Sequence, residues 1–364
     1  MKKNLLILAV AAVALASCSN DETVQSVANS DANAISFRPL NNGVTRAADI
    51  TGFTDTDFKV RADKSSDPYF AETVFSYDGV SAWTSTDKYY WPSDDADLTF
   101  YAYAPTTSSQ FTHTSGTNTF VVTPSATAAE QVDLVYATAT GKKSTHSAGV
   151  TLTFGHTESK VVIKLKNSNP NLKITTDNVV IGNVKGSGTY TMGSGWSSLG
   201  DATSYTQDFD FGATSSATQA GDAMILIPQE ITKATAYASA SAGAEFTGPY
   251  IAVDLKIQNS TSPFAYIVGA SSGVNEYVRA LFPLPTITWA LGTKYVYTVD
   301  LAGGGYYTTN QDSNADLDPI LEGAEIKFIS VTVSDWAAYD GDGDGDADAD
   351  GDSNNTNDPI EVGM

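Results

Sequence analysis

The feature that most constrains the fold is an alternation of apolar and polar residues with a period of two. The segments 160–166, 250–257 and 294–301 each place a large apolar residue at every second position. Because successive side chains of a β-strand point to opposite faces, this spacing predicts strands with one face on a core. The residues expected in that core are Val161, Ile163, Leu165, Ile251, Val253, Leu255, Ile257, Tyr295, Tyr297, Val299 and Leu301.

The rest of the chain supports the same fold class. Thr, Ser, Tyr and Val are abundant and Gly recurs at short intervals, as strands and tight turns require. No long segment beyond the N-terminal region shows helical periodicity. The sequence therefore predicts a mostly β protein built from β-sandwiches.

Two changes of composition predict how the chain is divided. Residues 167–171, Asn-Ser-Asn-Pro-Asn, form a polar cluster between two predicted strands, which is typical of a domain boundary. After Trp336 the pattern gives way to an Asp-rich segment, 340–352, that has no apolar face. Such a segment is expected to stay outside any core.

The N-terminal segment is typical of a secretory signal. Lys2 and Lys3 precede an apolar run over 5–16, which is shorter than the ~20 residues needed to span a bilayer. The run ends in Leu-Ala-Ser-Cys, which resembles the lipobox of bacterial lipoproteins. That resemblance implies a lipoprotein signal peptide over 1–17 and acylation of Cys18. The following residues, 19–22, resemble the surface-export signals of Bacteroidetes lipoproteins.

The charge of the chain excludes several classes of partner. Asp and Glu number 42 against 20 Lys and Arg, giving a net charge of −22. Such a chain repels nucleic acid and anionic lipid surfaces, so membrane attachment is expected only through the lipid on Cys18. This cysteine is the only one in the sequence, which leaves no partner for an internal disulfide.

The catalytic motifs present in the sequence are incomplete, and we predict that the protein is not an enzyme. Residues 269–273 match G-x-S-x-G, the pattern of a nucleophile elbow, with Ser271 at its centre. All three histidines precede this serine, whereas the α/β-hydrolase order places the histidine after it. We interpret the motif as a turn between strands, and we interpret His156 as a structural residue.

The Asp-rich segment is the one candidate metal site. Residues 346–351 match D-x-D-x-D-G, the start of a calcium loop, but Asn357 stands where the loop requires a bidentate Glu. Two interpretations stay open: a solvated tether, or weak calcium binding without any required cofactor. The carboxylates that would bind calcium are Asp346, Asp348, Asp350 and Asp352.

An ordered set of short motifs resembles the fimbrillin family, the lipoprotein-derived type V pilins of Bacteroidetes. They are the lipobox, ISFRPLNNGVTRAA, LTFYAYAP, LTFGHTESKVVIKLKN, AMILIPQEI, WALGTKYVYTVDL and IKFISVTVSDW, and they extend over nearly the whole chain. The resemblance implies two tandem transthyretin-like β-sandwich domains, which we place at 47–169 and 170–339. It also implies a fimbrial structural subunit on the outer membrane that supports adhesion to a host or bacterial surface.

The resemblance further implies maturation by an arginine-specific protease. Arg46 is one of four arginines in the chain and lies in a small-residue segment, so we expect cleavage between Arg46 and Ala47 and removal of a propeptide, 18–46. Ile35 and Phe37 alternate with polar residues, so residues 34–40 are predicted to form a strand that fills a groove in the first sandwich. Cleavage would release that strand, and other copies of the chain or related subunits would fill the groove.

Two donors for that groove stay open. The last segment, 340–364, ends in apolar residues at every second position, Ile360, Val362 and Met364, which resembles a short donor strand on an Asp-rich tether. The alternative donor is the segment after Ala47, with Phe53 and Phe58. An alternative function from another class is an anchored, glycan-binding lipoprotein, because Tyr89, Tyr90 and Trp91 could stack on a sugar.

Overall fold

The protein is almost entirely β-structure, as the sequence predicts. The computed structural model describes residues 33–41, 56–80, 82–233, 248–273, 276–303, 306–308, 318–319, 328–336 and 360–361. Within these residues the helical segments are two short 3-10 turns, η1 (Ala128–Glu130) and η3 (Leu301–Gly303). No helix in this part of the chain is long and apolar enough to cross a membrane.

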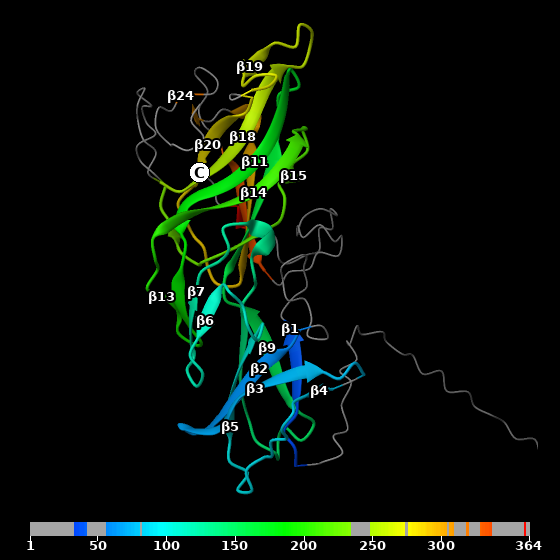
Figure 1. The fold of residues 1–364 in the computed structure, drawn as a ribbon, viewed down its shortest axis with the longest axis vertical. Coiled ribbons are helices and arrows are strands. Elements are labelled where there is room, and N and C mark those ends of the chain that lie inside the picture. Colours follow the sequence, from blue (N-terminus) through cyan, green and yellow to red (C-terminus); the bar gives the residue numbers. More distant parts are fainter. Residues whose placement is uncertain are drawn as a thin grey trace, which may run out of the picture.

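The N-terminal lobe is one curled seven-stranded sheet (Figure 1). Its order is β1-β9-β8-β5-β2-β3-β4, where the strands are β1 (Phe37–Asn41), β2 (Phe58–Lys64), β3 (Asp67–Tyr77), β4 (Trp83–Thr84), β5 (Leu98–Ala104), β8 (Val135–Gly141) and β9 (Val150–His156). The sheet curls far enough that Phe37 on β1 contacts Phe75 on β3, with ring centroids 4.9 Å apart. One apolar core therefore fills the inside of the curl.

The C-terminal lobe is a sandwich of two sheets. One has the order β14-β11-β18-β20-β23-β24, with β19 on β18; its strands are β11 (Leu172–Lys185), β14 (Ala202–Gly212), β18 (Tyr250–Asn259), β19 (Tyr266–Val268), β20 (Val278–Pro283), β23 (Tyr306–Thr308) and β24 (Asp318–Pro319). The other has the order β15-β10-β22-β25-β26, with β16 on β10; its strands are β10 (Ser159–Lys166), β15 (Thr218–Gln219), β16 (Met224–Leu226), β22 (Thr293–Asp300), β25 (Phe328–Asp335) and β26 (Ile360–Glu361).

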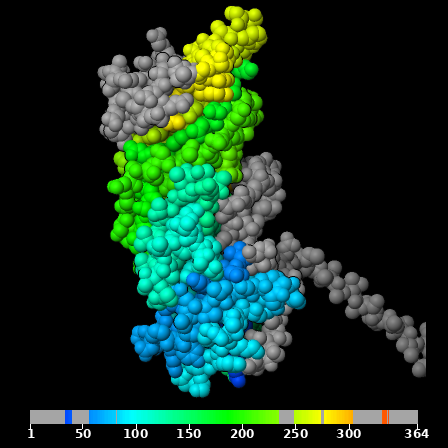
Figure 2. Space-filling model, viewed as in Figure 1, coloured from blue at the N-terminus to red at the C-terminus, as the bar shows by residue number. Residues whose placement is uncertain are grey.

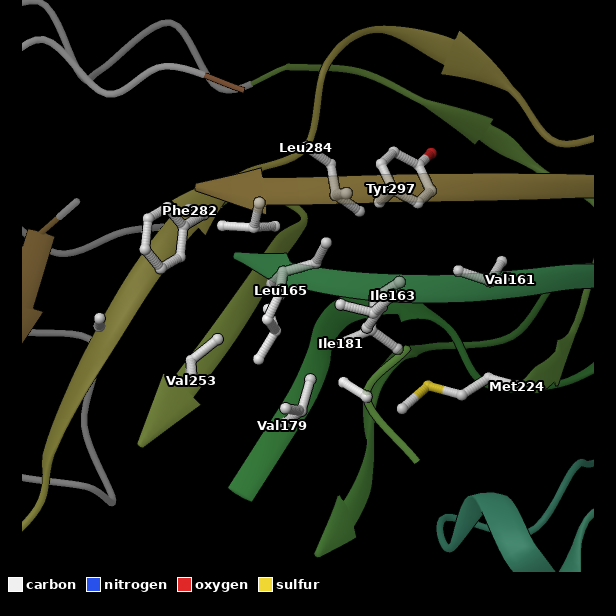
Figure 3. Close-up of a cluster of buried hydrophobic side chains, with 14 of the residues drawn as sticks. Val161, Ile163, Leu165, Val179, Ile181, Met224, Val253, Phe282, Leu284 and Tyr297 are labelled. Carbon is white, nitrogen blue, oxygen red and sulfur yellow. The ribbon is translucent and has the colours of Figure 1, made fainter. Parts of the chain in front are cut away.

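The core of this sandwich consists of the alternating residues that the sequence predicts. Val161, Ile163 and Leu165 on β10 face Val179, Ile181 and Val253 of the opposite sheet (Figure 3). All eleven predicted core residues belong to this cluster. On the opposite face of β18, Asp254 is also buried, because Arg279 on β20 pairs with both of its carboxylate oxygens at 2.9 Å.

A third, smaller sheet contains strands from both halves of the chain. Its order is β13-β12-β7-β6, where the strands are β6 (Phe111–His113), β7 (Thr119–Val122), β12 (Gly188–Thr191) and β13 (Gly195–Ser197). A two-stranded sheet, β17 (Glu230–Ile231) with β21 (Ile287–Thr288), completes the described strands. The small sheet lies between the lobes in Figure 1, and Figure 2 shows the molecule as one elongated body.

The predicted seam at 167–171 directly follows β10. That strand already pairs with β22 of the C-terminal lobe. The division of the chain into domains at residues 169 and 170 stays a prediction.

Candidate strand-exchange site

The strand that the sequence predicts near the N-terminus lies at the edge of the N-terminal lobe. The backbone of β1 pairs in parallel with β9, in a register that places Phe37 beside Val150 and Asn41 beside Phe154. Just before the strand, the Val150 amide donates to the Ser36 carbonyl oxygen at 2.8 Å. Since β1 ends the strand order, its ladder with β9 is the one strand ladder that its removal breaks among the described strands.

The apolar side chains of this segment enter the core at every second position. Ile35 and Phe37 are 7% and 3% exposed, and Pro39 is buried, whereas Ser36 and Arg38 are only half-buried. The Phe37 ring packs edge-on against Phe75 and Phe100, at centroid distances of 4.9 and 5.3 Å. Burial of each large apolar side chain contributes about 1.5–3 kcal/mol, and edge-on aromatic contacts add to that gain.

Two local sequence features suit this position. Pro39 has no amide hydrogen, so it fits an edge strand, where a missing donor interrupts no central ladder. Gly149 comes immediately before β9 with φ +107°, and a Cβ built there would lie 3.0 Å from the Ser36 Oγ. A glycine at 149 therefore allows the backbones of the two segments to approach each other.

The N-terminal end of the segment has a second attachment. Ala34 forms an antiparallel bridge with Tyr90, the Ile35 amide donates to the Tyr89 carbonyl at 2.8 Å, and the Trp91 amide donates to the Asn33 carbonyl at 3.1 Å. Nothing in the sequence predicts this contact, because the pairing joins segments more than fifty residues apart. The segment 33–41 is thus held by β9 on one side and by residues 89–91 near its start.

Release of β1 would leave a defined binding surface. The backbone edge of β9 over Val150–Phe154 would lose its partner, and Phe75 and Phe100 would lose their contact with Phe37. An unpaired edge beside empty apolar pockets accepts an added strand, with backbone hydrogen bonds for affinity and pockets for specificity. The edge of β9 and the pocket around Phe75 and Phe100 are therefore the features that a replacement strand would occupy.

Most of the site residues predicted from the sequence lie outside the described residues. These are Cys18, Arg46, Ala47, Asp346, Asp348, Asp350, Asp352, Val362 and Met364, and their predicted roles stay predictions. Ile360 is described in its backbone, and β26 pairs antiparallel with β25, placing Ile360 beside Val333 and Glu361 beside Thr332. Within the described residues, no three His, Cys, Asp or Glu side chains form a group that could hold a metal ion.

The other motifs singled out in the sequence occupy structural positions. Residues 269–273 connect β19 to the segment before β20, and Gly269 and Gly273 both have positive φ, as the interpretation of a strand-to-strand turn requires. His156 ends β9, where its Nδ1 lies 2.9 Å from the Asp133 carboxylate. Its ring stacks on Trp336 at a centroid distance of 3.8 Å.

A buried carboxyl pair that was not predicted from the sequence lies beside this histidine. Glu158 and Asp133 are each 1% exposed, and the Thr157 hydroxyl donates to Glu158 at 2.7 Å. Burial and then the charge of Asp133 raise the pKa of Glu158 well above its usual value. The only sequence signal was an acidic residue inside the predicted strand motif 152–167, where solvent exposure would be the ordinary expectation.

The comparisons with known proteins point to one family. A model of the fimbrillin-like family matches residues 45–336. A fimbrial protein from Bacteroides vulgatus shares the fold with a TM-score of 0.54 at 15% identity, covering 84% of this chain and 99% of that protein. A search among functionally curated proteins finds no match to the sequence.

Two further solved structures are more distant. A Bacteroides ovatus structure described as a cell adhesion protein has 16% identity and a TM-score of 0.48, covering 84% of this chain and 99% of its own. The fimbrial anchor protein Mfa2 from Porphyromonas gingivalis has 11% identity and a TM-score of 0.33, covering 84% of this chain and 100% of its own. Because the family model matches most of the sequence, from Thr45 to Trp336, this chain belongs to the fimbrillin-like family.

Proposed function

We propose that the protein is a structural subunit of a cell-surface fimbria that polymerises by protease-triggered strand exchange. The precursor is exported as a lipoprotein acylated on Cys18 and is anchored in the outer membrane. An arginine-specific protease cuts after Arg46, and the released segment carries away both β1 and the lipid. Membership of the fimbrillin-like family and the fold shared with a fimbrial protein support the fimbrial part of this proposal.

One observation carries the proposal: the apolar side chains of β1 enter the core of the N-terminal lobe, although the strand itself lies at the edge of the sheet. Ile35, Phe37 and Pro39 are buried, yet β1 pairs only with β9 among the described strands. A central strand could not leave without breaking two ladders, whereas this one can leave after a single cut in the chain that follows it. The uncut chain keeps its β9 edge covered and stays monomeric.

The C-terminal residues are the better candidate donor. Ile360 and Glu361 already lie as a strand on the edge of β25, which supports a strand-forming tendency in this segment. The alternative donor includes Phe58, which is fully buried in β2 between β3 and β5. Donating that part of the segment after Ala47 would remove a central strand from the lobe, so we assign the donor to Ile360, Val362 and Met364 of a neighbouring subunit.

Two measurements test the proposal: the N-terminal residue of the protein on fibres, and the formation of fibres by cells that express Arg46→Ala. We expect the wild-type chain on fibres to begin at Ala47, and Arg46→Ala to leave an acylated, folded precursor without fibres in electron micrographs. Thr45→Ala, which keeps the arginine, is the matched control and should give normal fibres. Fibres of wild-type length from Arg46→Ala, or a wild-type surface form that keeps acylated Cys18, would contradict the proposal.

The donor is tested separately in chains that keep Arg46. We expect deletion of residues 360–364 to leave cleavage intact and to slow assembly of the cleaved subunit, measured by light scattering. Assembly at the wild-type rate and extent would contradict a C-terminal donor and would favour the segment after Ala47 as the donor strand.

A further inference from the structure

The N-terminal lobe contains a cleft that strand exchange does not use. Its volume is about 700 Å³, within the range of small-ligand sites. Three segments form its walls: residue 33 just before β1, residues 90–95 before β5, and residues 143–147 between β8 and β9. Loops that converge from separate parts of a rigid sheet are a common position for binding residues.

Hydrogen bonds between the three segments hold the cleft in shape. The Trp91 amide donates to the Asn33 carbonyl at 3.1 Å, and the Lys143 ammonium donates to the Asn33 side chain. The Ser144 amide donates to the Asp95 carboxylate at 3.0 Å. Trp91 is buried and packs edge-on against Phe100 of the core, which fixes the base of the aromatic wall. The site is therefore formed before any ligand arrives, which lowers the cost of binding.

The chemistry of the walls combines an aromatic face with polar groups. Tyr90 is 44% exposed, and the Tyr69 hydroxyl holds its backbone by donating to the Tyr90 carbonyl at 2.8 Å. Serine hydroxyls, including Ser147, and the Asp95 carboxylate lie along the same cleft. A ligand that matches this set has an apolar face to stack on a ring and several hydroxyls to donate to a carboxylate.

We infer that this cleft binds a neutral saccharide unit of a surface glycan. The C–H face of the sugar stacks on Tyr90, and two of its hydroxyls donate to Asp95, while others exchange hydrogen bonds with Ser147 and accept one from the Lys143 ammonium. Asp95 and Lys143 carry opposite charges within the cleft, so neither sign of charge on a ligand is favoured there, and the net charge of −22 opposes an anionic ligand. A purely apolar ligand would take water away from the serine hydroxyls and from Asp95 without offering them a hydrogen bond, which disfavours its binding.

The cleft also depends on the segment that precedes β1. Asn33 supplies one wall and accepts the Trp91 amide, and it lies N-terminal to Arg46. If the chain is cut after Arg46 as the proposed function requires, the mature subunit loses this wall. The precursor is then the form that binds the saccharide, and binding is weakened when β1 leaves.

The experiment measures binding of the uncut Arg46→Ala chain to an array of immobilised neutral and acidic oligosaccharides. We expect neutral glycans to bind, Tyr90→Ala and Asp95→Asn each to lower affinity at least tenfold, and Tyr90→Phe to keep most of it. Phe264→Ala is the matched control, because Phe264 is 57% exposed in the other lobe, and it should bind like the parent chain. Melting temperatures confirm that each variant is folded.

Three results would overturn the inference: no binding to any array member, binding only to acidic glycans, or unchanged affinity in both Tyr90→Ala and Asp95→Asn. The link to maturation is a separate measurement, in which Arg46-containing chain is cut and β1 is released before binding is repeated. The array uses a chain that cannot be cut at Arg46, so its result does not depend on whether the wild-type chain is cleaved. Equally, an array without saccharide binding would not contradict cleavage after Arg46.

Discussion

At the scale of single residues, Phe37 links the segment before the predicted cleavage site to the core. The sequence predicts that Ile35 and Phe37 share an apolar face, and both are buried. It could not predict that the partners of Phe37 are Phe75 and Phe100, because these contacts exist only when the sheet curls and brings β1 near β3. Alternation determines which side of a strand is apolar, whereas the contacts across a core depend on the whole sheet.

Truncation of Phe37 tests its contribution directly. We expect Phe37→Ala to destabilise the N-terminal lobe of the uncut chain by about 3–5 kcal/mol, because it removes a buried ring and leaves a cavity. Urea denaturation measures the change. Ser36→Ala, at the neighbouring half-buried position, should change stability by less than about 0.5 kcal/mol. Equal effects of the two substitutions would show that Phe37 does not anchor the strand.

The buried Glu158 predicts a dependence of stability on pH. Its pKa is raised in the folded protein, so the folded state binds the proton more tightly than the unfolded state. The stabilising contribution is therefore complete below the unfolded pKa of about 4.5 and is lost as pH rises through the folded value. Glu158→Gln imitates the protonated side chain and should raise Tm at pH 8, by about 2–4 °C for each kcal/mol gained.

The same variant should have little effect on Tm at pH 4, where the wild-type carboxyl group is protonated in both states. Calorimetry at the two pH values gives the comparison. A larger rise of Tm at pH 4 than at pH 8 would contradict the direction of the pKa shift.

At the scale of elements, the strands were predictable and their partners were not. The motif LTFGHTESKVVIKLKN contains β9 and β10, and its alternation indicates both. Nothing in the sequence shows that β9 pairs with β1 while β10 pairs with β22, because parallel neighbours lie over a hundred residues away in each case. For the same reason, the sequence does not predict the small sheet of β6, β7, β12 and β13. It also does not predict that Asn33 forms one wall of the cleft.

Gly149 sets how closely β1 approaches β9, and its replacement should loosen the strand. Gly149→Ala places a Cβ near the Ser36 Oγ at a positive φ, which costs about 1–2 kcal/mol. We expect hydrogen exchange of the amides in 36–38 to accelerate roughly tenfold in the uncut chain. Gly155→Ala within β9 is the control, since no atom lies within 4 Å of the new Cβ and its φ is not positive. Equal exchange rates in the two variants would exclude this role for Gly149.

At the scale of the whole molecule, the two lobes have different roles in the proposed function. The C-terminal sandwich is closed around a large core, while the N-terminal lobe completes its core with a strand from the segment before Arg46. The third cluster contains residues from both halves, Tyr103 and Phe120 with Tyr190 and Ile227 among them, so the lobes are joined by packing as well as by the chain. In the proposed assembly, replacement of the strand that pairs with β9 would leave the C-terminal core and the third cluster unchanged, because β1 contributes no residue to either.

The central claim is that β1 must leave before the subunit can assemble, and a reversible lock on β1 tests it most directly. Arg38 and Thr151 are paired across the two strands, where neighbouring backbones lie about 4.8 Å apart, so cysteines at both positions can form a disulfide. In a chain that begins after Cys18, we expect the oxidised double variant to be cut after Arg46 and to stay monomeric in light scattering. Reductant should then start assembly at the wild-type rate, and each single variant should assemble without it. Assembly of the cut, oxidised double variant as fast as the reduced one would contradict the account.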